Sequence, residues 1–196
     1  MDARISTGAL TAVVVIAGLA IGSAINKALP STSDVLTEPF VHEAGVGDLV
    51  DLRTGEVAAT RVRTARSIVA DGGTLATEGT WVVVDLDFTA RAKPWAPGNA
   101  ALLSASGREY SDPYELHSSC ATGQSGVAQR CQIAVEVVTD DLPGLRLRIP
   151  AAPSGRMAGD DVALIDLEIA EGSDLVNSPE ELVEVARLAY GEGDLG

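Results

Sequence analysis

Residues 80–89 constrain the fold most strongly, because apolar side chains recur at every second position along this segment. One face of an extended chain would carry only apolar residues: Val82, Val84, Leu86 and Phe88. Asp85 and Asp87 fall on the opposite face. Successive side chains of a β-strand point to opposite faces of its sheet. The pattern therefore predicts a central strand with one face buried.

Similar short segments recur along the chain and are separated by glycine- and proline-rich turns. They lie at residues 48–53, 56–67, 100–105, 108–110, 131–137, 145–149 and 162–169. Residues 71–79 are expected to form a loop. No segment with a helical period lies between these strands, which argues against a parallel α/β fold. The sequence predicts an all-β sandwich of seven or eight antiparallel strands over residues 48–170.

An uncharged segment at residues 5–26 predicts a membrane anchor. A helix of this length can cross the bilayer's hydrocarbon core of about 30 Å. We interpret residues 1–27 as an uncleaved transmembrane signal-anchor and residues 28–47 as a stalk. A signal peptide cleaved near Ala24 is one alternative, because Gly22-Ser23-Ala24 resembles a cleavage site. A buried core helix is another.

Composition and charge narrow the possible partners. Hydrophobic residues make up 46% of the chain, which is enough to build a core, and the formal net charge is −14. The sequence contains no basic cluster that could follow a phosphate backbone, so we expect no nucleic-acid partner. Anionic lipid headgroups should also repel the domain.

Cys120 and Cys131 are the only two cysteines, and three interpretations are open for them. They could form a disulfide, hold half of a metal site, or be free thiols. A complete zinc site needs about four ligands, and the spacing of His42 and His117 does not pair them. In an extracytoplasmic domain the disulfide is favoured. The cysteine pair and the acidic domain together favour a location outside the cell membrane.

The C-terminal region, residues 171–196, is acidic and predicts one short amphipathic helix. Ser178-Pro179-Glu180-Glu181 resembles a capping box with proline at the first helical position. An apolar stripe follows on a helix ending near Tyr190. A helix this short needs to dock on its own domain or on a partner. Its candidate contact residues are Leu182, Val185 and Ala189.

Three segments in the middle of the chain resemble a known family. They are Gly55-Glu56-Val57, the strand beginning Gly79-Thr80-Trp81, and Leu102 to Tyr110 with its Ser106-Gly107 turn. Their order resembles the immunoglobulin-like (telokin-like) extracellular domain of unknown function that follows a membrane segment in Gram-positive envelope proteins. The resemblance covers roughly residues 45–170 and implies an immunoglobulin-like sandwich without shared catalytic residues. The cysteine pair and the C-terminal helix depart from that family.

No catalytic, cofactor-binding or metal-binding residue is predicted. Asp85 and Asp87 would lie about 6.6 Å apart on one strand face, and calcium would need loop carboxylates such as Asp140, Asp141, Asp160 or Asp161. A solvated outer face is the favoured interpretation of this pair. His117 lies beside two serines but lacks the Gly-x-Ser-x-Gly turn of a hydrolase.

Trp95, between Pro94 and Pro97, is a candidate interface anchor, or it folds back over the sandwich edge. We expect a non-enzymatic, single-pass extracytoplasmic protein that contacts an envelope or membrane protein, for example as an accessory subunit of a membrane complex. The transmembrane helix, Trp95 and the C-terminal helix are its candidate contacts. The alternative is a secreted or anchored domain that binds a small ligand, an ion or an envelope polymer.

Overall fold

The computed structural model describes residues 39–70, 72–111, 116–151 and 160–185, and these residues form two β-sheets that pack face to face. The predicted all-β sandwich is therefore confirmed, but the described residues form eleven strands and not the seven or eight that were predicted. Besides the strands, a 3-10 turn covers Thr139–Asp141 and the short helix α3 covers Asp174–Asn177. The strands are β1 (Phe40–Ala44), β2 (Val50–Leu52), β3 (Gly55–Ala70), β4 (Gly73–Ala90), β5 (Ala101–Leu103), β6 (Glu109–Tyr110), β7 (Leu116–Ser118), β8 (Ala128–Val137), β9 (Arg146–Pro150), β10 (Asp161–Asp166) and β11 (Val183–Glu184).

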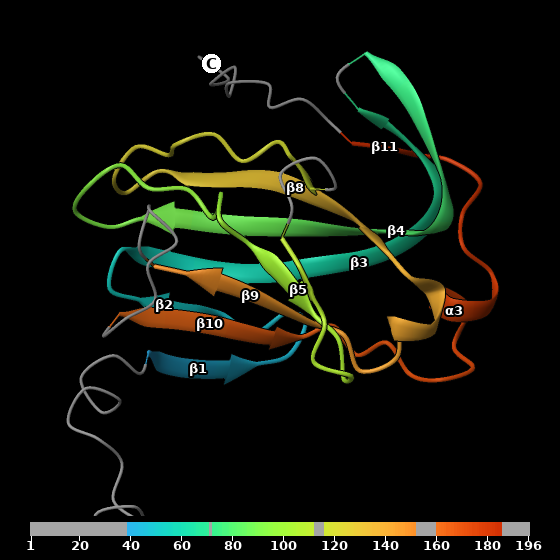
Figure 1. Ribbon diagram of the computed structural model, residues 1–196. Helices are drawn as coiled ribbons and strands as arrows, with labels where there is room; N and C mark the ends of the chain where they lie inside the picture. Colours follow the sequence, from blue (N-terminus) through green and yellow to red (C-terminus); the bar gives the residue numbers. More distant parts are fainter. Residues whose placement is uncertain (1–38, 71, 112–115, 152–159, 186–196) are drawn as a thin grey trace, which may run out of the picture. The chain divides into compact units, whose positions relative to one another are not determined.

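The two sheets differ in size and in strand order (Figure 1). One has five strands in the order β1-β10-β9-β5-β6. The other has six, in the order β11-β3-β4-β8-β7 with β2 added beside β3. Most neighbours are antiparallel, as predicted. Two pairs are parallel, β1 with β10 and β11 with β3, and the sequence patterns did not indicate them.

The main core lies between the sheets, and the predicted apolar face of β4 points into it. Val82, Val84 and Leu86 are fully buried there. Side chains from the five-stranded sheet meet them, among them Leu147, Ile149 and Ile165. Burial of these aliphatic side chains, each contributing about 1.5–3 kcal/mol, is the chief force that holds the sheets together.

The hairpin of β3 and β4 is longer than expected. Residues 73–79 belong to β4, and residues 73–76 pair with the end of β3 as far as the Ala70–Gly73 pair, so the predicted loop at 71–79 is wrong over most of its length. Gly72, with φ of +82°, lies at the tip, in a conformation that glycine adopts without strain. Gly72 and Gly73 were interpreted as part of a loop between strands, but they lie at a turn from which β4 immediately pairs with β3.

A second apolar cluster lies on the outer face of the six-stranded sheet, and we call it the outer cluster. Trp81 and Val83 of β4 enter it from the side opposite the main core. Val183 of β11 pairs in register with Ile68 of β3 and adds its side chain to the cluster. Its buried members are Ala65, Ile68, Ala70, Trp81, Val83, Ala134, Val183 and Val185.

The predicted C-terminal helix is wrong over residues 179–185. Glu180 exchanges backbone hydrogen bonds with β3, donating to Thr64 O and accepting from Arg66 N, both at 2.8 Å. Leu182 is 51% exposed while Val183 and Val185 are 2% and 8% exposed. This alternation is that of a strand, because pairing with β3 outweighs the local capping signal. Ala189 lies outside the described residues.

The sandwich extends beyond both predicted boundaries. Residues 40–44, assigned to the stalk, form β1, and residues 171–185, assigned to the tail, belong to the folded domain. Leu175 and Val176 of α3 pack against the main core. The predicted anchor at residues 1–27 lies outside the described residues. Among the described residues, no helix has the length and apolar character needed to cross a membrane.

Candidate functional site

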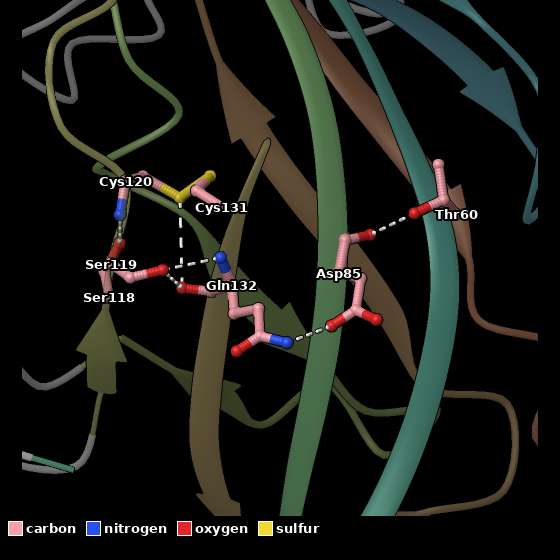
Figure 2. The surroundings of a disulfide bond; sticks show 7 residues. All are labelled: Thr60, Asp85, Ser118, Ser119, Cys120, Cys131 and Gln132. Carbon is pink, nitrogen blue, oxygen red and sulfur yellow. Dashed lines mark hydrogen bonds between the residues drawn. A yellow bond between two sulfur atoms is a disulfide. The ribbon is translucent and has the colours of Figure 1, made fainter. Parts of the chain in front are cut away.

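A disulfide bond joins Cys120 to Cys131, as the sequence suggested, at the edge of the six-stranded sheet (Figure 2). The two Cα atoms lie 4.8 Å apart. Cys131 lies on β8 opposite Leu86, so its side chain enters the main core. Cys120 follows β7, the edge strand of the described sheet. The bond therefore ties an edge segment to a central element of the fold.

Hydrogen bonds reinforce this connection. Ser119 N donates to Gln132 O at 2.8 Å, and Gln132 N donates to Ser119 Oγ at 2.8 Å. The side chain of Gln132 points along the outer face and donates from Nε2 to Asp85 Oδ1 at 2.7 Å (Figure 2). Gln132 thus connects the segment beside the disulfide to the carboxylates on the outer face of β4.

The loop that the disulfide closes holds Trp95 in place. Gly123 N donates to Trp95 O at 2.8 Å, and the Trp95 ring meets Phe88 edge-on at a centroid distance of 6.0 Å. A Cβ atom at residue 123 would lie 2.9 Å from the Phe88 ring, so any larger residue there would force the ring to shift. Trp95 is 3% exposed and belongs to the main core. Of the two interpretations, folding back over the sandwich is correct, because packing on Phe88 buries the large ring.

Asp85 and Asp87 share the outer face of β4, as predicted, and each is paired with an arginine. Arg63 Nη2 lies 3.0 Å from Asp85 Oδ1, and Arg130 Nε lies 3.1 Å from Asp87 Oδ1. A cation at this face would have to displace both arginines. Within the described residues, no group of three or more histidine, cysteine or acidic side chains is arranged to hold a metal ion.

Three of the four loop aspartates considered as cation ligands, Asp141, Asp160 and Asp161, interact with neighbouring side chains. Arg53 donates to both oxygens of Asp160 at 2.9 and 2.6 Å, and these hydrogen bonds lower the pKa of that carboxyl. His42 Nε2 lies 3.4 Å from Asp161 Oδ1, so this histidine belongs to the folded domain rather than to the stalk. His117 lies on β7.

Tyr110 and Asp141 connect the β5–β6 hairpin to the 3-10 turn. Tyr110 Oη donates to Asp141 Oδ2 at 2.6 Å, and Arg108 Nη1 lies 3.1 Å from the same oxygen. The hydrogen bond from Tyr110 is the main reason that the pKa of Asp141 is lowered, and Ser106 and Arg108 add to the effect. Burial and the bond to Asp141 raise the pKa of Tyr110. This network fixes a hairpin in place.

A recess of about 280 Å³ opens on the outer face, at the end of the sheet near β2. Its walls carry apolar and acidic groups together, and sequence reasoning missed it because its residues come from separated segments. Leu49 at its rim is 65% exposed. Among the residues that the structure describes, Glu56 has no ion-pair partner. The lining includes Leu49, Glu56, Asp87, Thr89, Ala128 and Arg130.

Comparison with known proteins finds solved structures with a similar fold but low sequence identity. No protein-family model matches the chain, and no curated protein sequence matches it. The yjhA protein of Bacillus subtilis superposes with a TM-score of 0.47 at 8% identity, covering 64% of this chain and 99% of that one. An uncharacterized β-sandwich protein of Clostridium difficile 630 superposes with a TM-score of 0.45 at 8% identity, covering 71% and 100%. The immunoglobulin-like (telokin-like) assignment and the Gram-positive envelope context stay predictions.

Proposed function

We propose that the protein is a non-enzymatic, membrane-anchored extracytoplasmic domain of immunoglobulin-like type that mediates protein–protein contact at the cell envelope. The observation that carries the proposal is the Cys120–Cys131 disulfide in a domain that follows the apolar segment at residues 5–26. Disulfides form and persist in oxidising compartments outside the cytosol. We propose an accessory subunit of a membrane complex as the specific form of this role.

The state of the carboxylates supports a non-enzymatic role. A general acid needs a carboxyl group whose pKa is raised toward neutral pH. Hydrogen bonds from Tyr110 and Arg53 instead lower the pKa values of Asp141 and Asp160. A hydrogen bond from Arg148 lowers the pKa of Glu109 in the same way. These groups stay ionised and bind their own arginine or tyrosine partners, which is the behaviour of structural ion pairs.

Exposed apolar side chains on ordered segments support a contact role. Leu49 and Leu182 are 65% and 51% exposed on the six-stranded sheet's side of the fold, and Phe40 is 65% exposed on β1. Large apolar side chains held outward on a rigid scaffold can anchor an interface. Of the contact residues proposed from the sequence, Leu182 keeps this role, whereas Val185 and Trp95 are buried.

Thiol labelling in intact cells tests the compartment. The full chain is expressed in a bacterial host, treated with a maleimide before and after reduction, and analysed by mass spectrometry of the Cys120 and Cys131 peptides. We expect labelling only after reduction. A version beginning at residue 28, which stays in the cytosol, is the control and should label without reduction. Free thiols in the full-length protein would contradict the proposal.

Gentle solubilisation of the source membranes tests the contact role. We expect the intact chain to purify with a stoichiometric membrane or envelope protein. Recovery as a monomer at every detergent concentration that leaves other membrane complexes intact would contradict it.

A further inference from the structure

We propose that the recess beside Leu49 is a docking site for one basic side chain, arginine or lysine, of a partner protein. This inference rests on the proposed contact function and names the chemistry of the partner. The recess lies on the outer face, where β2, β3, β4 and β8 end side by side.

The size of the recess favours a single side chain. Pockets that hold whole small molecules or cofactors measure about 300–1,000 Å³. At about 280 Å³ and open to solvent, the recess is no larger than the smallest of these pockets. It suits one long side chain that enters from a neighbouring protein surface.

The charge of the recess favours a cation. Asp87 is neutralised by Arg130 at 3.1 Å, which leaves the carboxylate of Glu56 as the uncompensated charge. Thr89 lies directly opposite Glu56 in the β3–β4 ladder and adds a hydroxyl beside it. An anionic group entering here would be repelled by the carboxylate of Glu56. The net charge of −14 also attracts a basic partner surface at long range.

The rim provides the apolar surface that such a side chain needs. Arginine and lysine bury their methylene stems against apolar groups while the charged head stays polar. Leu49 and Ala128 supply this surface on two sides of the recess. The segment before Leu49 is held by hydrogen bonds from Gly47 N to Ala59 O at 2.7 Å and from Gly45 N to Asp48 Oδ2 at 2.9 Å. The backbone leading to the exposed leucine is therefore held in place before any partner arrives, which lowers the entropic cost of binding.

The first experiment uses the isotope-labelled full chain in detergent micelles and NMR titration with N-acetyl-arginine methylamide. The citrulline analogue, which has nearly the same shape without the charge, is the matched probe. We expect saturable, millimolar binding of the arginine compound with shifts at Glu56, Thr89 and Ala128, and at least tenfold weaker binding of the citrulline compound. Equal effects of the two probes, or shifts centred elsewhere, would overturn the proposal.

Substitutions test whether arginine binding depends on the recess itself or only on the overall negative charge of the domain. Glu56→Gln and the exposed-site change Leu49→Ser should each weaken arginine binding at least fivefold. Glu43→Gln on β1 removes the same charge from the other sheet and should change binding less than twofold. A reduction by Glu43→Gln as large as that by Glu56→Gln would overturn a specific site. The dispersed spectrum of each variant verifies that it is folded, so a loss of binding is not a loss of fold.

Photo-crosslinking in the source membranes distinguishes failure of the recess from failure of the proposed function. A crosslinking residue is placed at position 49 or at position 182 of the intact chain. A protein adduct at position 49 that Glu56→Gln abolishes supports the docking site. An adduct at position 182 alone would overturn the docking site and leave the contact function standing. No adduct at either position, together with recovery of the chain as a monomer from gently solubilised membranes, would overturn the proposed function itself, whatever the arginine compound does in solution.

Discussion

The two ends of one sheet face behave differently. On the outer face of β4, Trp81 and Val83 are buried in the outer cluster, whereas Asp85 and Asp87 lie in a partly open row of ion pairs. All four residues occupy alternate positions of β4, and the ladder between β4 and β8 runs past them without interruption. The ladder with β3 has a bulge at Thr60, beside Asp85, but the pairing with β8 is the same at both ends. What differs is the neighbouring segment, because residues 180–185 pair with β3 at one end only, and Val183 and Val185 join the outer cluster there.

This contrast shows that a distant segment decides which half of a strand face becomes core. The long β3–β4 hairpin reaches β11, which lies beside it (Figure 1). Val183 and Val185 convert the face beneath them into a second hydrophobic layer. At the other end the same face keeps arginine, glutamine and carboxylate groups, which solvent can reach.

The largest effect should come from Trp81→Ala. Truncation of a buried tryptophan costs about 3–5 kcal/mol, and Trp81 is 3% exposed. Urea unfolding followed by circular dichroism measures the loss. Leu86→Ala in the main core is the matched control and should cost about 2–5 kcal/mol. A loss below about 1 kcal/mol for Trp81→Ala would mean that the outer cluster is no more than a surface patch.

The double substitution Cys120→Ser with Cys131→Ser should follow in size. The disulfide closes a short loop with a sequence separation of 11, and loops of this kind contribute about 2–4 kcal/mol. The readout is the unfolding midpoint of the oxidised protein, of the reduced protein and of the double variant. Reduction should reproduce the effect of the substitution. If neither change lowers the unfolding midpoint, the hydrogen bonds between Ser119 and Gln132 are sufficient to hold the segment after β7 against β8.

Val183→Ala tests whether β11 contributes to the burial of Trp81 in the outer cluster. It removes two methyl groups from a side chain that is 2% exposed, and we expect a loss of about 1–3 kcal/mol. The emission of Trp81 should also shift to longer wavelength in a Trp95→Phe background, because water reaches the indole. Leu182→Ala, next in sequence but 51% exposed, should leave both stability and emission nearly unchanged. An unshifted emission maximum in the Val183 variant would show that β11 does not protect Trp81.

Arg130→Ala at the open end should have the smallest effect. The pair with Asp87 is solvent-exposed on both sides, with 87% and 43% exposed side chains, and such pairs contribute about 0–1 kcal/mol. Thermal unfolding at low and high salt is the test. A loss of unfolding free energy above about 2 kcal/mol would contradict the view that the open end of the outer face contributes less to stability than the outer cluster.

Local patterns predicted the inner face of the sandwich but not its outer cluster. Period-two alternation in residues 80–89 correctly identified the side chains of β4 that enter the main core. It was silent on Trp81 and Val83, because their burial depends on residues about a hundred positions later. The capping motif at Ser178-Pro179 favoured a helix, and a local signal of this kind does not reveal that β3 has a free edge beside it.

The candidate site was predictable only in part. The disulfide followed from cysteine count and inferred compartment, and the shared face of Asp85 and Asp87 followed from strand periodicity. The recess could not be predicted. Its walls come from β2, β3, β4 and β8, and the sequence does not reveal the strand registers that bring them together. Trp95 was ambiguous for the same reason: its burial depends on Gly123, which the closed disulfide loop carries to it.

The parallel pairing of β1 with β10 has a consequence for how the chain matures. β1 is synthesised first among the described strands, and its partner β10 follows only after most of the domain has been made. At ordinary translation speeds the interval is on the order of ten seconds. During this wait Phe40 and Val41 have no sheet to join. A nascent domain of this topology therefore depends on its last third to complete its first strand, which makes premature termination more damaging than the small size of the missing piece suggests.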